Sequence, residues 1–142
     1  NGQGNVVPSL ALEMLRVAWG NSIVIVTGSE GVRGAAVDGL FMPTDRRARA
    51  WPYFTPSLSN RYISAADVLD GSYDPANLRH TAVLLGVTGL GLVDQKETPL
   101  GLMPGVEVAA QLLESMLSQN LLRRGRLNGE HRDCQDEHGC RA

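Results

Sequence analysis

The amino-acid sequence predicts an α/β or α+β domain in which a mixed β-sheet is packed by amphipathic helices. Two apolar runs, Ser22–Val26 and Thr81–Val87, have the composition of buried strands. Helical patterns lie around them, and the longest covers Met103–Arg124, where apolar residues recur every three or four positions. Strands and helices that share one chain in this way favour a sheet covered by helices.

Size and composition narrow the possible functions. The 142 residues suit one domain, and 43% hydrophobic with 20% charged residues is ordinary for a globular protein. A net charge of −2 argues against a nucleic-acid partner, which usually requires a basic surface. The two cysteines, Cys134 and Cys140, lie near the end of the chain, so no disulfide framework supports the body.

The first elements are expected to be a helix, a strand and a hairpin. Proline in the first turn and a capping Ser9 predict a helix over Pro8–Ala18. Its core face is expected to hold the apolar residues at helical spacing, namely Leu10, Met14 and Val17, with Ala11 and Ala18 beside them. A turn over Gly28–Gly34 then leads to a hairpin closed by Asp38-Gly39. The glycine spacing fits neither the dinucleotide fingerprint nor the P-loop.

The middle of the chain combines an aromatic group with short helical signals. Trp51, Tyr53 and Phe54 are expected to pack against the body, with a groove lining as the alternative. Ser64 can cap a short helix that ends at Gly71. His80 is interpreted as a structural or solvated residue rather than a catalytic one.

The segment from Thr81 to Leu122 is predicted to organise the domain as buried strand, glycine-rich loop and amphipathic helix. Glycines let a backbone approach a ligand closely, and loops at strand ends commonly present sites. The candidate ligand-binding residues are therefore Thr88, Gly89, Gly91, Asp94 and Thr98. In the alternative interpretation, the glycines only make the turn and the polar side chains brace it.

The last helix is expected to have one buried and one solvated face. The apolar stripe comprises Val106, Ala109, Ala110, Leu113, Leu117 and Leu121. The opposite, wet face comprises Glu107, Gln111, Glu114 and Ser118.

Beyond Gly125 the sequence becomes hydrophilic, and residues 125–142 are predicted to form a disordered tail. His131, Cys134, His138 and Cys140 do not have the spacing of a standard zinc finger, so no metal or other cofactor is assigned. No nucleophile with a matching base is recognisable in the body, so no catalytic residue is assigned either.

Several blocks of the sequence resemble the second class of CHASE sensor domain, an extracytoplasmic module of bacterial adenylate cyclases, histidine kinases and diguanylate cyclases. The blocks are Val7–Leu12, Arg61–Gly71, Val83–Asp94, Thr98–Gly101 and Pro104–Ala110. The resemblance implies that residues 1–124 are the carboxyl-terminal part of such a domain, because these domains usually begin with a βαβ-like half. Strand edges left open in this part could pair with a second copy or with another chain.

The resemblance also implies a function. A sensory input domain would bind a small-molecule or protein stimulus outside the cytoplasm and relay it to an intracellular cyclase or kinase. Attachment to the membrane would come from flanking segments. The alternative is a protein–protein interaction module that has no small-molecule ligand and uses the aromatic group as its surface.

Overall fold

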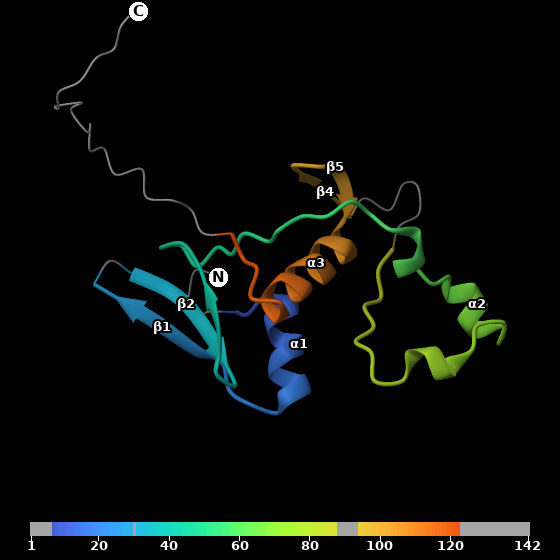
Figure 1. The fold of residues 1–142 in the computed structure, drawn as a ribbon, viewed down its shortest axis with the longest axis horizontal. Coiled ribbons are helices and arrows are strands. Elements are labelled where there is room, and N and C mark those ends of the chain that lie inside the picture. Colours follow the sequence, from blue (N-terminus) through green and yellow to red (C-terminus); the bar gives the residue numbers. More distant parts are fainter. Residues whose placement is uncertain (1–6, 30, 88–93, 123–142) are drawn as a thin grey trace, which may run out of the picture.

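The computed structural model describes residues 7–29, 31–87 and 94–122. These residues form helices and two small antiparallel sheets, which confirms the predicted mixed α/β class. Helix α3 (Gly105–Leu117) lies at the centre of the molecule, and helix α1 (Leu10–Trp19) packs against it (Figure 1). The larger sheet lies on one side of this helix pair, and the segment that contains α2 extends on the other.

Helix α1 lies close to its predicted bounds, but its buried face is shifted from the predicted one. The Ser9 hydroxyl accepts a hydrogen bond from the Leu12 amide, and Gly20 ends the helix in a left-handed conformation with φ 67°. The buried residues are Ala11 and Leu15, whereas the predicted core residue Leu10 is 59% exposed. Met14 packs against the core as predicted, but the prediction was wrong for Leu10 and for Val17, which is 64% exposed. Apolar residues occur on more than one side of this helix, so their spacing did not define a single face.

The larger sheet has the strand order β1-β2-β3, with β1 at Val24–Gly28, β2 at Gly31–Val37 and β3 at Leu40–Pro43. The predicted hairpin turn is confirmed, because Asp38 and Gly39 both have positive φ, at 49° and 80°. A turn of this kind matches the twist of antiparallel strands.

Strand β1 is more exposed than its composition predicted. Val24 is 58% exposed and Ile25 is 41% exposed, so the expectation of a buried strand here was wrong. The sheet contributes to the core through β2 and β3. The core consists of Ala11, Leu15, Ala35, Val37, Met42, Leu113 and Met116.

The middle of the chain has little regular structure. It contains a 3₁₀ turn η1 (Ser59–Arg61), the short helix α2 (Ala65–Leu69) and a second 3₁₀ turn η2 (Pro75–Leu78). The cap of α2 is confirmed, since the Ser64 hydroxyl accepts from the Ala66 amide. No residue between positions 56 and 87 is buried. This part of the chain is therefore held to the rest by surface contacts.

The apolar segment Thr81–Val87 does not form the predicted buried strand. Its odd-numbered side chains are exposed: Val83 at 53%, Leu85 at 91% and Val87 at 57%. On the other side, a Cβ at Gly86 would overlap the Val106 side chain, so the segment lies close against α3. The prediction failed because apolar composition shows that a segment prefers burial and does not show that a neighbouring strand is available.

A hairpin precedes α3 where a loop was predicted. Strand β4 (Gln95–Thr98) pairs with β5 (Gly101–Pro104), and α3 then begins at Gly105. Helix α3 ends at Leu117, earlier than the predicted end at Arg124. The Ser118 amide closes its last turn by donating to the Glu114 carbonyl.

We predict that Met42→Ala lowers the free energy of unfolding by about 2–5 kcal/mol, because it leaves a cavity in place of a fully buried side chain that is 1% exposed. Leu102→Ala is the control, since Leu102 is 68% exposed and its loss should cost about 0.5 kcal/mol or less. Urea denaturation followed by circular dichroism measures both. Equal destabilisation by the two variants would contradict the assignment of the core.

A polar face of helix α3 and the segment that crosses it as the candidate functional site

Helix α3 carries a stripe of buried polar side chains. Glu107, Gln111 and Ser115 follow one another at intervals of four residues, and they are 6%, 1% and 4% exposed. The prediction that Glu107 and Gln111 face solvent was therefore wrong. Glu114 and Ser118, from the same predicted wet face, are exposed as expected.

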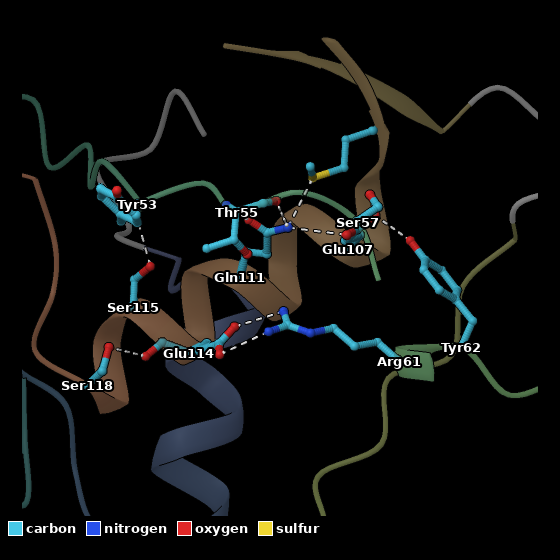
Figure 2. Close-up of polar contacts among 11 residues, drawn as sticks. Tyr53, Thr55, Ser57, Arg61, Tyr62, Glu107, Gln111, Glu114, Ser115 and Ser118 are labelled. Atoms are coloured by element: carbon cyan, nitrogen blue, oxygen red, sulfur yellow. Dashed lines mark hydrogen bonds and ion pairs between the residues drawn. The ribbon is translucent and has the colours of Figure 1, made fainter. Parts of the chain in front are cut away.

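The cover over this stripe is the segment Trp51–Tyr62, here called the strap. It runs along α3 in the opposite chain direction (Figures 1 and 2). The Tyr53 amide donates to the Ser115 hydroxyl at 3.2 Å. The Gln111 side chain binds both polar groups of the Thr55 backbone, accepting from the amide at 2.9 Å and donating to the carbonyl at 2.9 Å. The side chain of Gln111 thus pairs with the backbone of the strap as a neighbouring strand would.

The spacing of the two elements explains why these contacts repeat. Two residues of extended chain advance about 6.6 Å, and four residues of helix advance about 6 Å. Alternate strap residues can therefore meet successive turns of α3. At the far end, the Leu122 amide donates to the Trp51 carbonyl at 2.8 Å.

Glu107 anchors the other end of the strap. One oxygen of its carboxylate accepts from the Ser57 hydroxyl at 2.7 Å and also from the Tyr62 hydroxyl. The other oxygen accepts from Gln111 Nε2 at 3.2 Å. The buried carboxylate is thus satisfied by three donors, two of which belong to the strap.

The protonation of this anchor follows from its surroundings. Desolvation alone would raise the pKa of Glu107, but the hydrogen bonds from Tyr62, Ser57 and Gln111, with the charge of Arg61, outweigh it and hold the pKa below its ordinary value. The pKa of Tyr62 is raised to about 12. The largest cause is desolvation, followed by the hydrogen bond to Glu107 and by the negative charge of Glu107. At neutral pH the pair is therefore a carboxylate and a neutral phenol.

The remaining strap contacts are at the surface. Arg61 forms two hydrogen bonds with the Glu114 carboxylate, at 2.9 and 3.2 Å, and both side chains are partly exposed. An ion pair of this kind contributes about 0–1 kcal/mol. The three aromatic rings were expected to pack against the body. Trp51 is 41% exposed and Tyr53 is 52% exposed, whereas Phe54 is partly buried. It is the backbone of this aromatic segment that binds α3.

The predicted ligand-binding residues lie near the β4–β5 hairpin, as far as the structure describes them. Thr88, Gly89 and Gly91 lie outside the described residues. The Asp94 carboxylate forms an ion pair with Lys96 at 2.9 Å and occupies the space where a Cβ of Gly105 would lie. The Asp94 carbonyl also accepts from the Gly105 amide at 2.7 Å. Asp94 is thus held at the amino-terminal end of α3, where a negative charge is favourable.

Thr98 lies at the opposite end of strand β4. Its hydroxyl donates to the Gly101 carbonyl at 2.7 Å and accepts from the Leu100 amide at 3.2 Å, so it braces the hairpin turn. Four strand residues separate Thr98 from Asp94 by roughly 13 Å. The structure therefore does not bring these two predicted residues together, and their role in binding stays a prediction.

A shallow groove of about 470 Å³ lies between α3 and the apolar segment 81–87. Its lining is mostly apolar and comprises Ala82, Leu84, Ala110, Leu113, Glu114, Leu117 and Ser118. Leu117, predicted to be buried in the stripe, is 51% exposed. Helix α3 thus meets the core, the strap and the segment 81–87 on different sides of its axis.

Apart from the Thr55 hydroxyl, the polar groups described above are engaged with one another, and their arrangement suits attachment of a segment. Within the described ranges 7–29, 31–87 and 94–122, no three metal-binding side chains come together. The helices in the same ranges are all too short or too polar to cross a bilayer. Sequence reasoning missed the strap, although polar residues at every fourth position of α3 were its signal.

Comparison with known protein families identifies the family to which this chain belongs. The family model of the CHASE2 domain matches residues 1–130. The chain belongs to the CHASE2 domain family. CHASE2 domains are sensory domains on the extracytoplasmic side of the membrane and are generally non-catalytic. No curated protein and no solved structure matches the chain.

We predict that Glu107→Gln makes the CHASE2 domain less stable at pH 7 by about 1.5–3 kcal/mol, because hydrogen bonds to a charged group are lost. The wild-type carboxylate has its lowered pKa only when folded, so the unfolded state binds more protons below about pH 5. Wild-type stability should therefore fall as pH drops from about 5, and the variant should lose less. Urea titrations between pH 3 and 7 measure this difference.

Glu97→Gln is the matched control, because it removes the same charge from an exposed position on β4. It should leave both the stability at pH 7 and its acid dependence close to wild type. An equal acid dependence in the wild type and the Glu107→Gln variant would show that the carboxylate does not anchor the strap.

Proposed function

We propose that this CHASE2 domain is the sensory input domain of a bacterial transmembrane signalling receptor. In this proposal it binds an unknown stimulus outside the cytoplasm and relays it to an intracellular cyclase or kinase, without catalysing a reaction itself. The observation that carries the proposal is the family match over residues 1–130. Flanking segments of the receptor would supply the attachment to the membrane.

The polar site supports a role without catalysis. Its buried carboxylate, Glu107, already accepts three hydrogen bonds from the protein, and Gln111 is committed to the Thr55 backbone. A catalytic base needs an acceptor directed at a substrate. Side chains fixed in this way hold a segment in place, which suits transmission of a conformational change.

The predicted ligand-binding residues have a direct route to α3. Asp94 follows the glycine-rich segment in sequence, and its carbonyl binds the Gly105 amide at the first residue of the helix. A stimulus that moved Asp94 would therefore change the contacts at the start of α3. We infer that α3 is the element through which the signal leaves the domain.

We predict that the complete gene product exposes this domain on the outer side of the cytoplasmic membrane. With Cys134, Cys140 and any other native cysteine changed to serine, Ser59→Cys should react with a membrane-impermeant maleimide in intact spheroplasts, since Ser59 is exposed. Ala11→Cys, at a core position that is 1% exposed, is the control and should react only after denaturation. Labelling of Ser59→Cys only after lysis would place the domain in the cytoplasm and contradict the proposal.

We predict that a small-molecule stimulus raises the melting temperature of the wild-type domain and has little effect on Asp94→Ala. A ligand at 100 times its dissociation constant stabilises a protein by about 2.7 kcal/mol, which a thermal-shift screen detects readily. Glu97→Ala, on the neighbouring strand, should keep the full response. If Asp94→Ala responds as the wild type does, the ligand binds elsewhere.

The alternative function, a protein–protein interaction module, is favoured by the exposed rings of Trp51 and Tyr53. The same screen separates the two functions. A protein–protein interaction module without a small-molecule ligand would leave the screen without a response, and Trp51→Ala would then reduce binding of its protein partner.

A further inference from the structure

The residues between the larger sheet and β4 are attached to the molecule in an unusual way. The core cluster is formed by α1, β2, β3 and α3, and none of its residues belongs to the strap or to residues 63–87. The partly buried apolar residues that pack against the core, Leu12, Met14, Ile23, Leu40, Leu112 and Leu121, also lie outside this region. The core would therefore keep its own contacts if the strap moved away.

A series of polar contacts holds the strap to α3 and the residues after it. They are the hydrogen bonds to Ser115, Gln111 and Glu107, the backbone bond at Leu122 and the Arg61–Glu114 ion pair. Parts of a protein with few buried apolar contacts open at a lower free energy than the global unfolding reaction. No strap residue is fully buried: Pro52, Phe54 and Thr55 are partly buried, and the rest of the strap is exposed.

The docked strap also contains an unfavourable feature. The Thr55 hydroxyl is buried and has no hydrogen-bond partner among the described residues, although the backbone of Thr55 is bound on both sides by Gln111. A buried hydroxyl without a partner opposes the docked state, and it would regain its hydrogen bonds in water when the strap left. The docked state thus combines a series of hydrogen bonds that stabilise it with one buried hydroxyl that destabilises it.

We propose that residues Trp51–Tyr62 form a releasable strap, which leaves the polar face of α3 as one unit while the core of the domain stays folded. Helix α3 then has two states, one braced by the strap and one in which Glu107, Gln111 and Ser115 face solvent. The alternate pairing of strap residues with helix turns makes the contacts cooperative, because loss of one register position loosens its neighbours. Release is a property of this chain alone, so its test is independent of the receptor function proposed above.

Amide hydrogen exchange of the full chain, resolved by residue with NMR, tests the proposal. Three amides report on the docked strap: those of Tyr53 and Thr55 in the strap, and that of Leu122, which binds the Trp51 carbonyl. The amides of Leu15 and Leu113 report on the core. We expect the three strap reporters to be protected by a similar factor, and the core amides to be protected at least tenfold more.

Two substitutions should move the strap reporters in opposite directions. Gln111→Ala removes both hydrogen bonds to the Thr55 backbone and should speed exchange of the strap reporters about tenfold, with less effect on the core amides. Thr55→Val removes the unpartnered hydroxyl and should slow exchange of the same reporters. Ser118→Ala is the control on α3, because its hydroxyl bonds to the Glu114 carbonyl and to nothing in the strap.

The proposal is overturned if the strap and core amides of the wild type exchange with equal protection, since the domain would then open only by global unfolding. It is also overturned if the strap reporters show no protection, because the strap would not be docked. Acceleration of strap and core by the same factor in Gln111→Ala, or of the strap reporters in Ser118→Ala, would likewise contradict release as a separate unit.

Discussion

The constraint on which this structure depends is that one short helix must satisfy several different neighbours. Helix α3 directs Leu113 and Met116 toward α1 and the sheet, Glu107, Gln111 and Ser115 toward the strap, and Ala110 and Leu117 toward the groove beside segment 81–87. Residues four apart on a helix advance by about 40° around its axis, so the polar stripe fills a narrow sector next to the apolar one. A displacement of α3 caused by one neighbour would therefore also change its contacts with the others.

The sequence allowed the local elements to be predicted well. The approximate bounds of α1, its Ser9 cap, the Asp38-Gly39 turn and the Ser64 cap of α2 all follow from interactions within a few residues. The same holds for the presence of helix α3, although not for the side on which its polar residues lie. These features depend on capping hydrogen bonds and on allowed backbone angles, and both can be inferred from the residue types at a few neighbouring positions.

The surroundings of each element were harder to predict, because they depend on segments distant in sequence. Glu107 and Gln111 were assigned to solvent since polar residues on a helix usually face water. Their true partners, Ser57 and Thr55, lie 50 and 56 positions earlier. Segment Thr81–Val87 shows the opposite error, because its apolar residues were assigned to a sheet and Leu85 lies at the surface. Periodicity describes the sides of an element, and it leaves open which segment covers each side.

The contacts at the start of α3 suggest how a sensory domain of this family can use such an arrangement. Asp94 contacts the helix at Gly105, and Glu107 begins the strap interface only two residues later. Movement at Asp94 would therefore alter the first turn of α3, which also positions the carboxylate that holds Ser57 and Tyr62. Closely packed elements transmit strain, so in the proposed function a small displacement at the start of the helix would reach the segments packed along it. Coupling between the predicted stimulus site and the strap thus requires only one turn of helix and one buried carboxylate.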